Sequence, residues 1–375
     1  MLISQQKITP RITDLLGIFK KQDKKEIQNL VRKYILNQHL YWTGSGREAL
    51  RQILLDIKEN LSKTQNRAHN NNNNQNNLKV GMPAFTCHVV LDAVKRAGCQ
   101  PVFYDSGVVA EAEDIEKIIN NVDALILCHN FGFLPNIPKI KELCQKNKVI
   151  LIEDCAQALG AKFNNQLAGS FGDYAFYSFG ISKNIGFCGG LIGSKHKLNI
   201  RRQPFFPTAK LIKIIGETII SPLFFNRYIY HYTSKLLKNE LIKEQESLDY
   251  QLPNFTKKII LNQFKRYDQI IKKRRKNADY CIQELNRHTN LIKPIKQTNP
   301  AWLYFTLFSD NKEQLIHKLL KAGVELGEMQ TFQCLDGKST KAKEAEKHLT
   351  FALYRDEKEI KYIVDKIKRI INERT

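Results

Sequence analysis

The sequence predicts an α/β fold in which a mostly parallel sheet lies between helices, with a smaller C-terminal α+β domain after it. Two observations predict this fold. Short, almost continuously hydrophobic runs alternate with helical patterns beyond residue 78, and long, charged helical patterns replace them beyond Pro253. Runs of the first kind are typical of parallel strands covered by helices on both faces. Because such folds bind ligands at the carboxyl ends of their strands, functional residues are expected just after these runs.

Each predicted element follows from one run. The predicted strands of the large sheet are Leu78–Gly81, Val102–Tyr104, Ala124–Cys128, Val149–Glu153, Tyr174–Ser178 and Leu191–Gly193, with helices such as Ile137–Asn147 between them. The C-terminal part is predicted to contain one strand, Ala301–Phe308, and the helices Lys257–Asn286, Glu313–Ala322, Ala345–Leu353 and Glu357–Asn372. We therefore expect a large domain over residues 1–252 and a small domain over residues 253–375.

Two segments interrupt this order. The Asn-rich run Asn70–Asn77 cannot bury apolar surface, so we expect a surface loop over residues 61–78. The stretch Lys210–Tyr232 is apolar but interrupted by charges and by Pro222, and it falls short of the about 20 apolar residues of a spanning helix. We interpret it as two amphipathic helices packed on the domain or on a subunit interface. Contact with a membrane surface is the less favoured alternative.

Composition narrows the class of protein. Hydrophobic residues (42%) and charged residues (26%) are present in ordinary globular amounts, which excludes a fibre, a membrane bundle or a wholly disordered chain. The net charge of +22 favours anionic partners, such as nucleic acid, anionic lipid or phosphorylated metabolites. We interpret the basic run Lys272–Lys276 as a solvated helix face. A nucleic-acid patch is the alternative, but no recognition motif accompanies it.

The eight cysteines are scattered and form no CxxC pair or zinc-spaced His/Cys cluster. We therefore expect free thiols in a reducing compartment, and no metal site. Met1–Lys21 contains no continuous apolar run or cleavage site, so we expect a cytoplasmic protein.

Three features carry chemistry. The glycine-rich turn Thr43–Arg47 precedes an amphipathic helix, whose first N–H groups can bind a phosphate; a simple helix cap is the alternative. Glu153 and Asp154 end a buried strand, so one of them should face the ligand crevice, unless they form a structural ion pair. Lys183 follows a later strand, where a neutral amine would suit Schiff-base chemistry; an exposed loop lysine is the alternative.

Together these features match the three attachment points of pyridoxal phosphate: its phosphate, its ring nitrogen and its aldehyde. From Tyr41 to Ile371 the chain resembles the DegT/DnrJ/StrS family of pyridoxal-phosphate sugar aminotransferases. The resemblance rests on six motifs in the family's order, namely Gly44–Leu50, Pro83–Thr86, His129–Gly132, Glu153–Gly160, Gly169–Asp173 and Tyr177–Asn184.

The resemblance implies a role for each cofactor-binding residue. Lys183 would form the Schiff base, and Asp154 would pair with the ring nitrogen. The other implied contacts are Gln157 with the phenolic oxygen and Gly46, Arg47 and Ser178 with the phosphate. Some family members dehydrate sugars and carry histidine at the lysine position, so Lys183 favours transamination.

The chain departs from the family pattern in three places, one of which is the additional Asn-rich loop. Threonine is frequent in the family where Arg47 stands, and an aromatic residue that stacks on the cofactor ring is frequent where Cys87 stands. We expect Cys87, or the adjacent His88, to lie against the ring. Asn254 falls where the family contacts a partner subunit, and we expect it to reach the partner's cofactor phosphate.

The sequence thus predicts a fold-type-I pyridoxal-phosphate aminotransferase that moves an amino group from glutamate to a keto sugar carried on a nucleotide. The resemblance implies a homodimer, and we expect no nucleic-acid partner. Another pyridoxal-phosphate reaction, such as sugar dehydration or chemistry on a non-sugar ketone, is the first alternative. A non-catalytic basic homologue that regulates or binds nucleic acid is the second.

Overall fold

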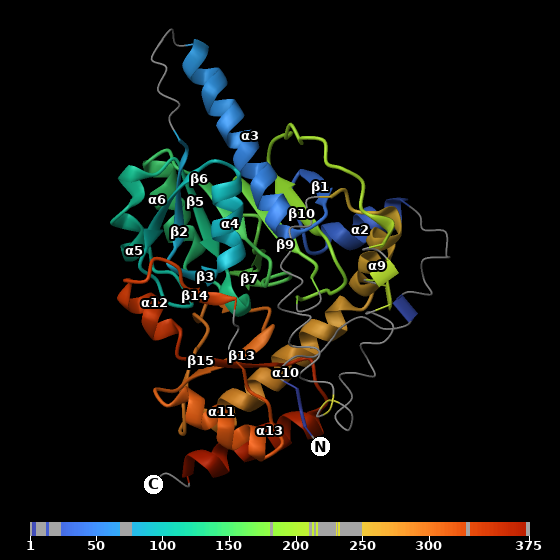
Figure 1. The fold of residues 1–375 in the computed structure, drawn as a ribbon, viewed down its shortest axis with the longest axis vertical. Helices are drawn as coiled ribbons and strands as arrows, with labels where there is room; N and C mark the ends of the chain where they lie inside the picture. The colour runs from blue at the N-terminus through green and yellow to red at the C-terminus, as the bar shows by residue number, and fades with distance from the viewer. Residues whose placement is uncertain are drawn as a thin grey trace.

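The computed structural model describes residues 2–4, 13–14, 24–67, 77–180, 183–209, 212–213, 215–216, 230, 232, 250–327 and 331–372. A large sheet with helices on both faces occupies the upper part of Figure 1, and a smaller α+β part lies below it. The predicted α/β class with a mostly parallel sheet is confirmed.

Seven strands form the large sheet in the order β1-β10-β9-β6-β5-β2-β4. In that order they span His39–Thr43, Gly190–Ser194, Tyr174–Ser178, Ile150–Asp154, Ala124–Cys128, Lys79–Pro83 and Gln100–Tyr104. β9, β6, β5, β2 and β4 run parallel to one another. β10 is antiparallel to both of its neighbours, β9 and β1. Six strands of this sheet therefore share one direction, and their carboxyl ends meet at one edge.

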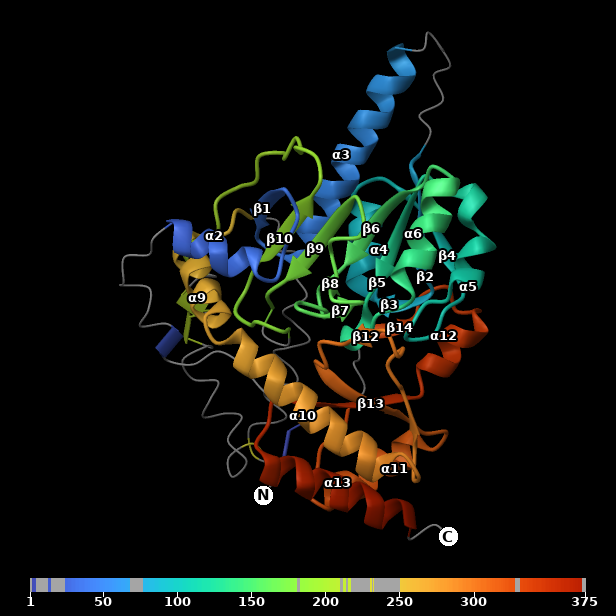
Figure 2. The same ribbon diagram turned by 180° about the vertical axis from the view of Figure 1, so that it is seen from behind.

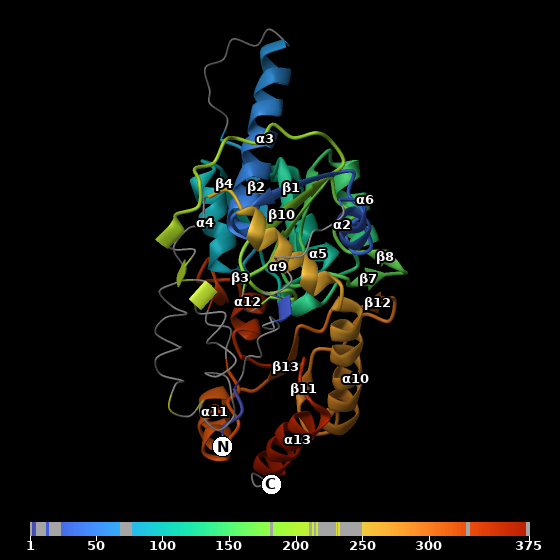
Figure 3. The same ribbon diagram turned by 90° about the vertical axis from the view of Figure 1, so that its right-hand side faces the viewer.

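Side chains of the central strands alternate between two helical layers. In β5, Ile126 and Cys128 pack in the apolar cluster of α3 (Gly46–Arg67) and α4 (His88–Arg96), whereas Leu125 and Leu127 pack in the cluster of α6 (Ile137–Lys146). Figure 3 shows α4 and α6 on either side of the strands. The α6 layer also includes α2 (Lys24–Arg32) and α5 (Ala112–Glu116), the latter followed by the short helix η2 (Ile119–Asn121).

The helix α3 begins at the carboxyl end of β1, where the hydroxyl of Ser45 accepts a hydrogen bond from the N–H of Glu48 at 3.1 Å. Its far end projects beyond the sheet (Figures 1 and 2). Residues 61–67 of the expected surface loop are helical instead, because Leu61 continues the apolar side of the helix and packs on the α3/α4 cluster. Residues 68–76 lie outside the described residues.

Most of the apolar stretch 210–232 also lies outside the described residues, so its two helices stay a prediction. Within the described ranges, none of the helices combines the length and apolarity needed to cross a bilayer.

The C-terminal part contains a three-stranded antiparallel sheet, β11-β13-β15, with the bounds Asn290–Leu291, Tyr304–Phe308 and His348–Ala352. The helices α11 (Lys312–Lys321) and α13 (Glu357–Asn372) pack in its apolar cluster. The helix expected over Ala345–Leu353 is wrong, because this segment forms β15. All five residues of β15 are buried, and a short, fully buried run has no periodicity that separates strand from helix.

A bend replaces the single helix expected over Lys257–Asn286. The helices α9 (Asn254–Phe264) and α10 (Tyr267–Leu285) meet at Arg266, whose φ of −112° is not helical. No proline or glycine marks this bend. α9 and the first half of α10 pack on the large sheet's side, whereas the second half of α10 packs in the C-terminal cluster, so α10 joins the two parts (Figure 2). The domain division at residue 253 stays a prediction.

Two small sheets also join the parts. β3 (Phe85–Cys87) pairs with β14 (Phe332–Cys334), and α12 (Thr340–Ala345) packs beside them. The second small sheet has the order β12-β7-β8, with the bounds Thr298–Asn299, Lys162–Phe163 and Gln166–Leu167. Segments far apart in the sequence thus meet next to the carboxyl ends of the large sheet's strands.

The basic run Lys272–Lys276 lies on α10. Arg274 is 2% exposed, so the expected fully solvated face is wrong at this residue. The ammonium groups of Lys273 and Lys276 pair with the carboxylates of the two residues that precede and begin α13, Asp356 and Glu357. The run is therefore not a continuous basic surface.

The close contact between β10 and the start of α3 generates a prediction. A Cβ atom on Gly190 would lie 2.7 Å from the backbone nitrogen of Gly46, and closer still to the carbonyl oxygen of Ser45. Gly190→Ala should therefore push α3 away from the sheet and lower the free energy of unfolding by about 1–3 kcal/mol. Urea denaturation measures this change.

Gly107→Ala is the matched control, because the nearest heavy atom to its added Cβ lies 3.9 Å away, which is ordinary contact. An equal, small effect of both substitutions would contradict the close packing of β10 on α3.

Candidate active site

A cavity opens at the carboxyl ends of the large sheet's strands. It is lined by Gly46, Arg47, Leu50, Cys87, Val89, Val90, His129, Asn130, Asp154, Ala156, Gln157, Phe176, Ser178, Lys183 and Phe332. Seven residues that the sequence singled out thus lie together: Gly46, Arg47, Cys87, Asp154, Gln157, Ser178 and Lys183.

Strand direction explains this convergence. Asp154 ends β6 and Ser178 ends β9, and these two strands are parallel neighbours. β1 runs in the same direction as β9, so α3, which follows β1, also begins at this edge. A Cβ on Gly46 would lie 2.7 Å from the Cβ of Ser178. The residue at position 46 must therefore be glycine for the helix start to approach the end of β9 so closely.

The alternation of β6 decides which of the two adjacent carboxylates faces the cavity. Ile152 packs in the α3/α4 cluster and Leu151 packs in the α6 cluster. Asp154, two residues after Ile152, therefore lies on the side of α3 and lines the cavity, whereas Glu153 points the other way and is fully buried.

Glu153 is a structural anchor. Its carboxylate accepts hydrogen bonds from three backbone N–H groups, of Gly169, Phe171 and Gly172, at 2.7–2.8 Å, and from Nε2 of His129 at 3.0 Å. The ligand atoms of Glu153, His129 and Cys155 lie within 4.8 Å of one another, as in a metal site. Because the Glu153 oxygens are already occupied by four donors, this arrangement suits a hydrogen-bonded anchor.

The carboxylate of Asp154 accepts two hydrogen bonds from the described residues, and one of them is weak. Its Oδ1 accepts the N–H of Ala156 at 2.9 Å, and its Oδ2 accepts the thiol of Cys128 at 3.6 Å. Burial raises the pKa of Asp154, and the nearby charge of Lys183 only partly opposes this effect. A buried carboxylate of this kind is suited to a cationic partner, such as a protonated ring nitrogen.

Gln157 is fixed by its carbonyl end. Its Oε1 accepts the N–H of Phe131 at 2.6 Å, within the short helix η3 (Asn130–Gly132), where Phe131 has a left-handed φ of 57°. Its buried Nε2 has no hydrogen-bond partner among the described residues. An amide N–H at the cavity is therefore available to donate to a ligand oxygen.

Lys183 lies in the turn after β9, where its N–H donates to the carbonyl oxygen of Gly180 at 3.0 Å. Its side chain lines the same cavity as Asp154. The lysine is therefore part of the pocket rather than a fully exposed loop residue.

These residues fit pyridoxal phosphate. Three features support this fit: the unpartnered amide of Gln157, the buried carboxylate of Asp154 and the close approach that Gly46 permits at the start of α3. A helix start attracts a phosphate, a carboxylate attracts a protonated ring nitrogen, and a lysine amine attracts an aldehyde.

The expected cofactor contacts of Cys87, His88 and Asn254 have different outcomes. Cys87 lines the cavity, and His88 is not part of the lining of the described pocket. Asn254 lies exposed at the start of α9, outside this lining, so its reach to a partner's cofactor stays a prediction.

Sequence reasoning missed His129 and Phe332 as lining residues. His129 belongs to a motif that the sequence singled out, and its position directly after a buried strand could have identified it. Phe332 follows no such signal, because it reaches the cavity through the pairing of β14 with β3.

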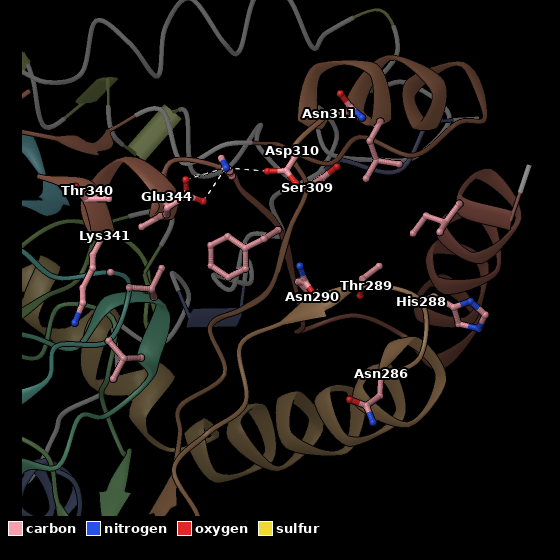
Figure 4. A pocket seen from close by; sticks show the side chains of 18 of the residues that line it. Asn286, His288, Thr289, Asn290, Ser309, Asp310, Asn311, Thr340, Lys341 and Glu344 are labelled. Atoms are coloured by element: carbon pink, nitrogen blue, oxygen red, sulfur yellow. Dashed lines mark hydrogen bonds and ion pairs between the residues drawn. The ribbon is translucent and has the colours of Figure 1, made fainter. Parts of the chain in front are cut away.

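A larger hollow, shown in Figure 4, lies between residues 107–111, the segment that follows α10, the start of α11, and α12. Five of its charged side chains pair with one another: Lys347 with Asp310 and Glu344, and Lys341 with Glu111. It contains none of the residues predicted to carry chemistry, so we place the candidate site in the smaller cavity.

The fold and the cavity fit an α/β transferase of the pyridoxal-phosphate-dependent class. Within that class, the chain belongs to the DegT/DnrJ/EryC1/StrS aminotransferase family, whose model matches residues 22–210 and 221–350. A curated relative is GDP-perosamine synthase of Escherichia coli O157:H7, which is 26% identical over 255 residues. The match covers 66% of this chain and 64% of the relative, so the chain spans just under two thirds of that protein.

Solved structures share the fold. PseC of Helicobacter pylori, an aminotransferase involved in the biosynthesis of pseudoaminic acid, has a TM-score of 0.72 at 13% identity, with 100% of both chains covered. The GDP-4-keto-6-deoxy-D-mannose-3-dehydratase of E. coli with bound hydrated PLP has a TM-score of 0.67 at 17% identity. That match covers 98% of this chain and 100% of the dehydratase.

The burial of Asp154 generates a prediction about the ligand-free protein. Because burial raises its pKa, the folded state binds this proton more tightly than the unfolded state does. The stability that this bound proton contributes is fully present below the ordinary pKa of Asp. It is lost as the pH rises through the pKa of Asp154 in the folded state. The melting temperature of Asp154→Asn should therefore exceed that of the wild type by an amount that grows as the pH rises above the ordinary pKa of Asp, by about 2–4 °C per kcal/mol.

Asp173→Asn is the control, because Asp173 accepts the N–H of Leu151 at 3.0 Å and pairs with Lys195 at 3.2 Å. Its replacement should lower the melting temperature. If Asp154→Asn also melted at or below the wild type at every pH, the carboxylate would not be a source of instability.

Proposed function

We propose that this protein is a pyridoxal-phosphate-dependent aminotransferase that transfers an amino group from glutamate to a keto sugar, carried on a nucleotide. One observation carries the proposal. Lys183 and Asp154, which follow two neighbouring parallel strands, line the same cavity beside the start of α3. Family membership supports the reaction class.

The cavity offers candidate residues for the phosphate, the ring nitrogen and the phenolic oxygen of the cofactor. The helix start at Gly46 and Arg47, with the hydroxyl of Ser178, would hold the phosphate. Asp154 would hold the ring nitrogen in its protonated form, and Nε2 of Gln157 would donate to the phenolic oxygen. When bound, pyridoxal phosphate supplies an aldehyde that bonds to amines and a ring that accepts an electron pair.

The protein's own residues would transfer the proton and place a negative charge beside the ring nitrogen. The amine of Lys183 would be the base that moves the proton from the substrate Cα. The Asp154 carboxylate would keep the ring nitrogen protonated, so that the ring can accept the electron pair left when the Cα proton leaves. The same two residues would act on the amino-acid donor and, in the reverse direction, on the ketone acceptor.

The acceptor is proposed from two lines of support. The net charge of +22 favours an anionic substrate, such as a nucleoside diphosphate sugar. The relative and the dehydratase described above both carry the names of GDP-linked sugars. We also propose a homodimer in which Asn254 reaches the partner's site, consistent with its exposure on α9.

Replacing Lys183 by Ala tests the proposal directly. Turnover should fall by at least about 10²-fold, from the lost proton transfer alone, and borohydride should no longer attach cofactor to the protein. Mass spectrometry of the reduced wild type measures the labelled peptide, and the melting temperature of the variant should stay near that of the wild type. Lys257→Ala, on α9 and outside the cavity lining, is the control. Borohydride labelling of a lysine other than Lys183 would refute the assignment.

The exchange of Asp154 for Asn should affect turnover more than affinity. A charge-assisted hydrogen bond contributes about 1.5–3 kcal/mol to cofactor binding, and turnover should fall further because an unprotonated ring accepts the electron pair less readily. Cofactor titration gives the affinity, and single-turnover kinetics with glutamate gives the rate. A variant with wild-type turnover would remove Asp154 from the mechanism.

A further inference from the structure

The cavity wall at Cys87 contains an aromatic ring from a distant part of the chain. In the antiparallel pair of β3 and β14, Phe332 is the direct register partner of Cys87. Directly opposed side chains lie on the same face of a sheet, with Cβ atoms about 4.5–5.5 Å apart. Both side chains line the cavity that contains Asp154 and Lys183.

The ring of Phe332 is held in place by other aromatic rings. Its centroid lies 6.0 Å from that of Phe85 and 5.0 Å from that of Phe131, and the side chain is 7% exposed. The strand pair is extended by hydrogen bonds on both sides, from the N–H of His88 to Thr331 O at 2.9 Å and from Leu335 N–H to Ala84 O at 2.8 Å. The side chain of Phe332 therefore loses little conformational entropy when a ligand binds against it.

We propose that Phe332 is the aromatic residue that packs against the pyridine ring of the cofactor in this chain, beside the small thiol of Cys87. This inference rests on the proposed function. Cys87 offers one polarisable atom, whereas Phe332 adds an aromatic face of the kind that stacks on a planar ring. The ring contact is therefore supplied across the β3/β14 pair, by the C-terminal part of the molecule.

The test compares cofactor affinity in matched variants. Phe332→Leu removes the ring from the cavity wall, and Phe85→Leu removes a ring from the same aromatic cluster but outside the cavity lining. The dissociation constant of pyridoxal phosphate is measured for each apo-protein by absorbance titration. We expect the constant to rise about 2- to 12-fold in Phe332→Leu and to change less than 2-fold in Phe85→Leu. Where Phe332→Leu does not fold, Phe332→Met keeps the volume, and the same rise is expected.

A second ligand separates ring contact from general damage. Inorganic phosphate should occupy the start of α3 without touching Phe332, so its affinity, measured by thermal shift, should be the same in the wild type and in Phe332→Leu. A parallel loss of phosphate affinity, or equal cofactor affinity in the Phe332 and Phe85 variants, would overturn the inference. Failure of the wild type itself to bind pyridoxal phosphate would instead overturn the proposed function.

Discussion

The buried carboxylate of Glu153 is the interaction on which the candidate site depends. It ties the end of β6 to the loop that leads into β9 and to the end of β5, through three backbone N–H groups and the imidazole of His129. Because a carboxylate only accepts hydrogen bonds, this contact places a proton on Nε2 of His129. With Glu153 anchored on one face of the sheet, strand geometry forces its neighbour Asp154 to the other face, at the cavity.

Several features of the candidate site are unfavourable for stability. Asp154 is a buried carboxylate with weak hydrogen-bond support, Gln157 has a buried amide without a partner, and Phe131 adopts a left-handed backbone conformation. Each feature would be unfavourable in an ordinary core, and natural proteins concentrate such features at functional sites. The anchored Glu153 and the packed strands supply the stability that tolerates them.

Much of the fold could be predicted from the sequence because the central strands are hydrophobic on both faces. Ala124–Cys128 and Tyr174–Ser178 have the predicted bounds. The site residues near strand ends were accessible for the same reason. His348–Ala352 was not, because a short buried run fits helix and strand equally well. The place of Phe332 at the cavity was not predictable either, since it depends on a pairing between strands about 245 residues apart in sequence.

The pairing of β3 with β14 has a consequence for biosynthesis. A chain emerges from the ribosome amino end first, and its early segments can fold before the later ones exist. The large sheet is fully encoded by residue 194, but the cavity gains its wall at Phe332 after most of the chain has been synthesised. The nascent protein therefore cannot complete this pocket during most of its translation, and the wall closes only near the end of synthesis.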